Sequence, residues 1–139
     1  MENSVQPGVT ATRRWCAGAD RCIGFMGDNL RGYGTPFFTD DMEYTYRDVI
    51  LDHPFENEDS VGTRVELDHP ASALIGMWID ISVTVAKVEG RLVTFHFTAR
   101  DEVEETGRGR HVRFVVDKAR TGERLTAKRT LLSTHPKDA

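Results

Sequence analysis

The chain has 139 residues, of which 39% are hydrophobic and 29% are charged, and this predicts one globular domain over residues 1–139. Its formal net charge of −4 at pH 7 gives no overall positive field to attract nucleic acid, so we expect no nucleic-acid partner. No apolar run is long enough to cross a bilayer, and the first residues lack the basic and apolar regions of a signal peptide. We therefore expect a cytoplasmic protein with no membrane partner.

The N-terminal part predicts a strand followed by a long loop. Residues 1–8 are polar and predict a flexible leader, whereas residues 9–15 favour an edge strand. Five glycines between residues 17 and 34 indicate an irregular loop, either a cover for a functional site or a plain connection. Cys16 and Cys22 lack zinc-type spacing, so we expect reduced packing residues and no metal site.

The next predicted element is the one long helix, over residues 36–53. Thr35 is a common N-cap residue and Pro36 suits the first helical position, while the proline at position 54 is expected to end the helix. Residues at helical spacing predict a face turned to the core, namely Phe38, Met42, Tyr46, Val49 and Ile50. Glu43 lies beside this stripe, and a carboxylate next to a buried face is a candidate for chemistry.

The second half of the chain alternates with period two. This pattern predicts four antiparallel strands, at residues 60–69, 78–88, 92–100 and 108–117, with a hairpin between the second and the third. The predicted apolar face of the first strand holds Val61, Thr63, Val65, Leu67 and His69. A short helix over residues 118–128, weakened by Gly122, and a frayed end at 133–139 complete the prediction.

One helix packed on a single antiparallel sheet is an α+β architecture. One helix cannot cover both faces of a sheet, and Val115 adds an apolar residue to the opposite side of its strand from its neighbours. We therefore expect a partner subunit to complete the burial.

Four motifs together resemble the fluoroacetyl-CoA thioesterase family of acyl-CoA thioesterases, which has the hotdog fold. The family has a Thr at the start of its central helix, a Met-Glu pair that places Glu eight residues on, a Ser-x-Gly-Thr run leading to a His, and a Gly-x-Gly-x-His-x-Arg strand. In this chain the corresponding residues are Thr35, Met42-Glu43, Ser60-Val61-Gly62-Thr63 with His69, and the run from Gly107 to Arg113. The spacing fits without a gap from the first motif to the last.

The resemblance implies an antiparallel sheet wrapped around one central helix, and a homodimer or dimer of dimers. It implies a catalytic group of Thr35, Glu43 and His69, with coenzyme A as part of the substrate and no separate cofactor. The aromatic lid of the fluoroacetyl enzyme is not reproduced at residues 25–30, so fluoroacetyl selectivity is not expected. The predicted activity is hydrolysis of a small or polar acyl-CoA to the acid and CoA. The alternative is a non-catalytic hotdog module that binds an acyl-CoA or related ligand, or serves as an interaction partner.

Each predicted catalytic residue also has a purely structural interpretation. Thr35 is explained as a helix cap, Glu43 as a solvent-facing helix residue and His69 as a hydrogen-bonded core histidine. In the functional interpretation, Thr35 and the free helix N–H groups position the thioester. Glu43 then activates water or attacks directly, and His69 transfers protons.

The predicted substrate-binding residues are Gly62, Arg113, Arg108 and Arg110. Arg113 forms a structural ion pair or orients the catalytic carboxylate or the substrate. Arg108 and Arg110, together with Arg91, meet the phosphates of CoA or form a solvated charged rim, because guanidinium groups suit phosphate.

Overall fold

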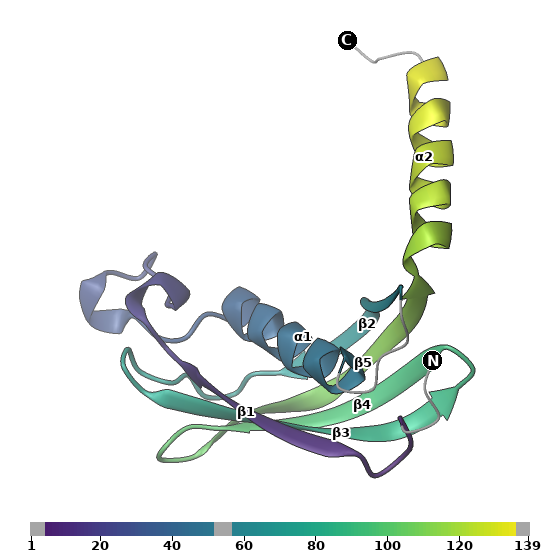
Figure 1. Ribbon diagram of the computed structural model, residues 1–139. Coiled ribbons are helices and arrows are strands. Elements are labelled where there is room, and N and C mark those ends of the chain that lie inside the picture. Colours follow the sequence, from purple (N-terminus) through teal and green to yellow (C-terminus); the bar gives the residue numbers. More distant parts are fainter. Residues whose placement is uncertain (1–4, 52–56, 136–139) are drawn as a thin grey trace.

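The computed structural model describes residues 5–51 and 57–135, and its main feature is one helix lying across a curved antiparallel sheet (Figure 1). The elements are β1 (Thr10–Cys16), α1 (Thr35–Leu51), β2 (Glu58–Asp68), β3 (Trp78–Glu89), β4 (Leu92–Arg100), β5 (Glu105–Asp117) and α2 (Lys118–Thr134). Two short 3₁₀ turns, Ala19–Arg21 and Asp28–Leu30, lie in the glycine-rich loop. The strand order is β1-β3-β4-β5-β2, so β1 and β2 form the two edges.

The core lies between α1 and the inner face of the sheet, as the helical and alternating patterns predicted. Every residue of the predicted helical stripe, from Phe38 to Ile50, is at most 4% exposed. The inward residues of the β3–β4 hairpin are at most 2% exposed: Ile79, Ile81, Val83, Val85, Val93, Phe95, Phe97 and Ala99. Burying each large side chain of this kind contributes about 1.5–3 kcal/mol, so this layer fixes the position of α1 over the sheet.

The predicted face of β2 is wrong at its start, because the strand carries an irregularity. Pairing with β5 shifts register between Gly62 and Arg64. This shift reverses the alternation, so Gly62 faces α1 while Val61 lies on the outer face and is 46% exposed. A bulge inserts an extra residue and re-aims the side chains that follow it. Gly62 within the strand pattern is compatible with a bulge, but residue type alone does not show where the register changes.

Three further parts of the chain differ from the prediction: the N-terminal leader, the C-terminal helix and Cys16. The expected leader is partly ordered, because Val5 is 2% exposed and the Gly8 N–H donates to the carbonyl of Val85. The C-terminal helix is longer than predicted and reaches Thr134. Cys22 is buried as expected, but Cys16 is exposed, and both are free thiols. The predicted end of the central helix at His53-Pro54 lies outside the described residues.

Helix α2 begins directly after β5 and has no buried residue. The Asp117 carboxylate caps it by accepting hydrogen bonds from the N–H groups of Ala119 and Arg120. In Figure 1 the helix projects away from the sheet rather than packing on it. None of the helices in the described part of the chain is long and apolar enough to span a membrane.

Candidate active site

Thr35 and His69 meet at the N-terminal end of α1. The hydroxyl of Thr35 lies 2.9 Å from Nδ1 of His69, so it contacts the imidazole instead of forming the backbone cap that the sequence predicted. The His69 ring packs edge-on against Phe38, with centroids 4.8 Å apart, and against Tyr33 at 6.3 Å. Burial lowers the pKa of His69 below its usual value. The imidazole is therefore neutral near pH 7 and can accept a proton.

The second nitrogen of His69 has no hydrogen-bond partner in the described residues, although it is buried. A buried polar atom without a partner costs free energy, and such atoms occur where a ligand or water completes the hydrogen bonding. Nε2 of His69 thus retains unused hydrogen-bonding capacity.

Glu43 lies two turns further along α1, where β2 comes closest to the helix. A Cβ atom added to Gly62 would lie 2.6 Å from Oε1 of Glu43 and 2.9 Å from Cε1 of His111. Only glycine therefore leaves room for both side chains at this point of β2. Glu43 also lines a groove of about 390 Å³, together with Arg113, Asp40, Tyr44 and Arg47.

Arg113 is a buried cation that pairs with no carboxylate in the described part of the chain. Its guanidinium donates to the hydroxyl and to the carbonyl oxygen of Ser60, both at 2.8 Å, and Nη1 lies 3.1 Å from Nε2 of His111. Burial lowers the pKa of Arg113, and the charge of Glu43 opposes this effect. The predicted structural ion pair is therefore replaced by an electrostatic interaction with the candidate catalytic carboxylate.

His111, which the sequence left without a role, lies in the centre of this group. It is fully buried and stacks on Tyr46 with ring centroids 4.5 Å apart. Burial and the charge of Arg113 together lower the pKa of His111 to about 4. The alternation of β5 did not identify it, because Val112, Phe114 and Val116 form the more apolar face of this strand, whereas the structure buries His111, Arg113 and Val115 on the face toward α1.

The predicted residues thus form two groups within one chain. Thr35 contacts His69, whereas Glu43 lies with Gly62, His111 and Arg113. Eight residues separate Thr35 from Glu43, which corresponds to about 12 Å along a helix axis. No hydrogen bond joins the two groups among the described residues.

The polar residues early in α1 have a structural explanation. Asp41 is fully buried, accepts hydrogen bonds from the Tyr33 hydroxyl and from Arg21, and forms an ion pair with Arg21. Burial raises the pKa of the Asp41 carboxyl, and the two donors oppose the rise. The side chain of Thr39 donates to the carbonyl of Thr35 one turn earlier. These contacts attach the glycine-rich loop to α1 directly beside Thr35.

Arg108 and Arg110 lie apart from both groups. Arg108 pairs with Glu105 at 2.9 Å and Arg110 with Glu66 at 3.1 Å, and both arginines are exposed. Within residues 5–51 and 57–135, no group of three or more His, Cys, Asp or Glu has the arrangement of a metal site.

The fold and these residues define a hotdog protein of the thioesterase type. A thioesterase superfamily member from Thermus thermophilus is 25% identical, with a TM-score of 0.85 over 94% of this chain and 98% of that chain. A hot-dog-like protein from Thermanaerovibrio acidaminovorans is 23% identical, with a TM-score of 0.77 over 94% of each chain. These similarities confirm the hotdog fold that the sequence motifs implied.

The family follows from the sequence comparison. The family model for fluoroacetyl-CoA-specific thioesterase matches residues 18–119. The fluoroacetyl-CoA thioesterase of Streptantibioticus cattleyicolor is 29% identical over 84 residues, which span 60% of this chain and 60% of that protein. The chain belongs to the fluoroacetyl-CoA-specific thioesterase family, as the four motifs indicated.

Proposed function

We propose that this protein hydrolyses a small or polar acyl-CoA thioester to the free acid and CoA. The observation that carries the proposal is the contact between the Thr35 hydroxyl and the partly buried His69 at the N-terminus of α1, where burial lowers the pKa of the imidazole. Free N–H groups at a helix start stabilise the negative charge that develops on a thioester oxygen. Family membership gives independent support for this chemistry.

In the proposed reaction, Thr35 and the first-turn N–H groups position the thioester carbonyl. Glu43 removes a proton from the attacking water, or it attacks the carbonyl directly and forms an anhydride with the acyl group. In the second case water then hydrolyses this anhydride and restores the Glu43 carboxylate. The carbon–sulfur bond breaks as the tetrahedral intermediate collapses. His69 accepts a proton from the carboxylic acid formed from the hydrolytic water and passes it to the departing thiolate, whereas Glu43 releases any proton it has taken to solvent, so the products are the carboxylate and the CoA thiol. Arg113 and Gly62 hold the Glu43 carboxylate in place, the first by charge and the second by leaving space.

We propose that the working unit is a homodimer paired through β2. This edge strand has 11 residues, is unpaired on one side and exposes the side chains of Val61 and Val65. Two-fold antiparallel pairing of β2 edges places the end of one strand beside the start of the other. Thr35 and His69 then approach Glu43 of the partner subunit, which would unite the two groups.

Two substitutions test the catalytic assignment. Glu43→Gln and His69→Ala should each lower kcat/KM for the best acyl-CoA at least about 100-fold, the usual loss for a general acid or base. The matched controls are Glu89→Gln and His96→Ala, which alter exposed residues and should leave kcat/KM unchanged. If no acyl-CoA in a panel releases thiol faster than buffer does, while one of them raises the melting temperature, the protein is a binding module instead.

Mixing the two inactive variants tests the shared site. In a statistical mixture, half of the dimers are mixed and each carries one intact site, so activity should return to about a quarter of the wild-type value. Activity that stays at the level of the separate variants would place the whole site in one subunit. A 15.7 kDa species in light scattering at micromolar concentration would exclude the dimer itself.

We also propose the cytoplasm as the compartment and no cofactor besides the CoA of the substrate. The two free thiols, Cys16 and Cys22, support a reducing compartment, although Cys22 alone is buried.

A further inference from the structure

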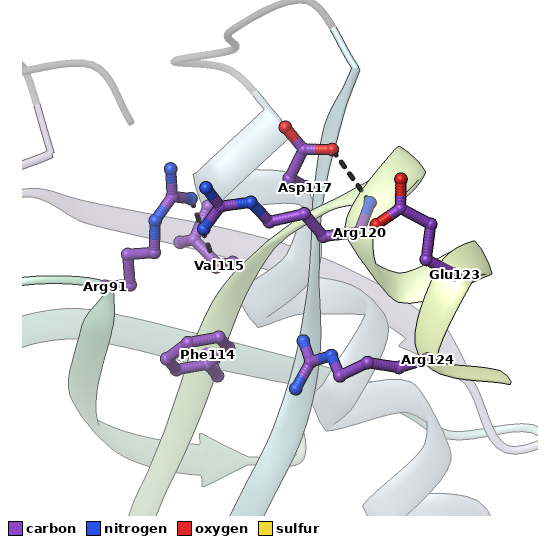
Figure 2. A pocket seen from close by; sticks show the side chains of 7 residues that line it. All are labelled: Arg91, Phe114, Val115, Asp117, Arg120, Glu123 and Arg124. Carbon is purple, nitrogen blue, oxygen red and sulfur yellow. Dashed lines mark hydrogen bonds between the residues drawn. The ribbon is translucent and has the colours of Figure 1, made fainter. Parts of the chain in front are cut away.

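Three arginines converge on a groove at the base of α2. The groove has a volume of about 600 Å³ and lies between the start of α2, the turn after β3 and the neighbouring part of β5. Arg91 comes from the turn, whereas Arg120 and Arg124 come from the first two turns of α2. Figure 2 shows Arg120 reaching back toward Arg91, with Arg124 and the ring of Phe114 below them.

The positive charge of this arginine groove is only partly compensated. Arg91 donates to the carbonyl of Val115 at 3.3 Å and pairs with Glu58. The guanidinium groups of Arg120 and Arg124 have no hydrogen bond or ion pair within the described part of the chain. Two carboxylates also line the groove: Asp117 is already engaged as the N-cap of α2, and Glu123 lies in the second turn of the helix, so the three arginines exceed the lining acids by one. Like charges gathered in one groove favour an anionic ligand.

The arginines belong to a basic segment on an acidic protein. Helix α2 contains five Lys or Arg and one Glu, a formal charge of +4, whereas the whole chain has a charge of −4. All five basic side chains are exposed. The helix also lies almost entirely beyond residues 18–119, which match the family model. The family pattern therefore does not account for this concentration of positive charge.

Neighbouring grooves connect the arginine groove to Glu43. The groove that contains Glu43 and Arg113 shares Arg47 with the next groove along β2. That second groove shares Leu125 with a third, and the third shares Phe114 and Arg124 with the arginine groove. The arginine groove and the groove that contains Glu43 are therefore linked by a series of neighbouring grooves that share lining residues.

We propose that the arginine groove binds the phosphate-bearing nucleotide of the CoA thioester, an inference that rests on the proposed function. The planar guanidinium group forms paired hydrogen bonds with phosphate oxygens, and three such groups match a ligand with several phosphates. The half-buried ring of Phe114 offers a face on which the adenine base stacks. Arg120 and Arg124 take the phosphate-binding role that the sequence suggested for Arg108 and Arg110, whereas Arg91 keeps it.

Direct binding provides the first test. Adenosine 3′,5′-bisphosphate, the nucleotide part of CoA, is titrated calorimetrically into the wild-type protein, the double variant Arg120→Glu/Arg124→Glu and the milder Arg120→Gln/Arg124→Gln. Both double variants should lose at least tenfold in affinity, the charge reversal more than the neutral change. Arg129→Glu is the matched control, because it reverses an exposed charge on the same helix outside the groove, and it should change affinity less than twofold.

Inorganic phosphate is titrated in parallel to separate the two sources of phosphate. If phosphate alone binds as tightly as the nucleotide, the groove is a free-phosphate site and the proposal is wrong. Equal losses in Arg129→Glu and the double variants would show a general charge effect, which also overturns it.

Kinetics provide the second test. The ratio of KM for an acyl-CoA to KM for the matching acyl-pantetheine, which lacks the nucleotide, should rise at least tenfold in Arg120→Glu/Arg124→Glu. An unchanged ratio in an active enzyme would contradict nucleotide recognition by this groove. If the wild-type protein hydrolyses neither substrate, the proposed function fails, and the calorimetric titration still decides the binding inference independently.

Discussion

Two buried polar clusters lie on opposite sides of α1, and they differ in how completely their groups are partnered. Glu43 and Asp41 are two residues apart, so they point about 200° apart around the helix. On one side, the Asp41 carboxylate is fully bound by Arg21 and Tyr33. On the other side, Arg113 has no hydrogen-bonded carboxylate.

The difference separates a structural cluster from a candidate catalytic one. A closed set of partners stabilises one conformation and leaves nothing for a ligand to bind. The cluster beside Glu43 retains binding capacity, because Nδ1 of His111 is buried without a partner among residues 5–51 and 57–135. The charge of Arg113 is balanced mainly at a distance by Glu43. Polar groups on the two sides of one helix therefore differ in how much hydrogen-bonding capacity they leave open.

The largest expected effect is a loss of stability when the cluster of Asp41, Arg21 and Tyr33 is broken. Asp41→Ala removes a fully buried carboxylate and leaves Arg21 and the Tyr33 hydroxyl without their partner, so we expect a loss of about 3 kcal/mol in the free energy of unfolding. Urea unfolding measures this loss. Asp40→Ala is the control, because Asp40 pairs with the same arginine at 3.2 Å but is 54% exposed, and it should lose less than about 1 kcal/mol. Equal losses of unfolding free energy in Asp41→Ala and Asp40→Ala would show that the buried Asp41 cluster is no more important for stability than an exposed ion pair.

The second effect is a dependence of stability on pH that comes from His111 in the cluster beside Glu43. The pKa of His111 is about 4 in the folded protein, below the value of about 6.5 expected when unfolded, so the unfolded chain binds a proton first. Its contribution is complete above pH 6.5 and is lost as the pH falls toward 4, by about 3 kcal/mol in all. Arg113 and Tyr46 contact His111, and Glu43 faces it across Gly62.

The variant His111→Phe keeps a ring against Tyr46 and removes the titrating group. Between pH 7 and pH 4, the unfolding free energy of this variant should fall by about 3 kcal/mol less than that of the wild-type protein. His69, whose pKa is also lowered, contributes with the same sign in both proteins. Identical pH dependence in the two proteins would show that His111 does not titrate as described.

The smallest effect concerns the space beside Glu43. The methyl group of Gly62→Ala would displace the flexible end of Glu43, because His111 is fixed in its stack. Small misplacements of reacting groups are costly, so we expect kcat/KM to fall about tenfold. Urea stability should fall as well, because the methyl group also comes within 2.9 Å of Cε1 of the buried His111. Thr63→Ala, one residue further along β2, is the control. Wild-type activity in Gly62→Ala would show that the position of Glu43 is not critical.

The sequence predicts the layers of the fold well, since periodicity depends directly on which side of an element is buried. The helical stripe and the β3–β4 hairpin follow their patterns. The motifs implied a group of Thr35, Glu43 and His69, and of these three residues Thr35 and His69 are in contact within one chain. The side of the sheet on which each β2 residue lies was not predictable. A bulge turns the residues that follow it to the opposite face of the sheet, and residue types do not show where this happens.

The partners of polar residues were also not predictable from the pattern. Asp41 lies in the buried phase of α1, between Phe38 and Thr45, and this phase indicates burial but not a partner. Arg21 approaches it from a loop twenty residues earlier, where periodicity carries no information. Long-range contacts of this kind determine which polar groups remain open.

The unpaired edge of β2 also has a consequence for solubility. An exposed strand edge is a template on which other chains can add strands and aggregate. Pairing two such edges around a two-fold axis closes this template with the same contact that completes the proposed site. Substitutions that weaken this pairing would then release monomers with an exposed, aggregation-prone strand edge, so loss of activity and precipitation would occur together.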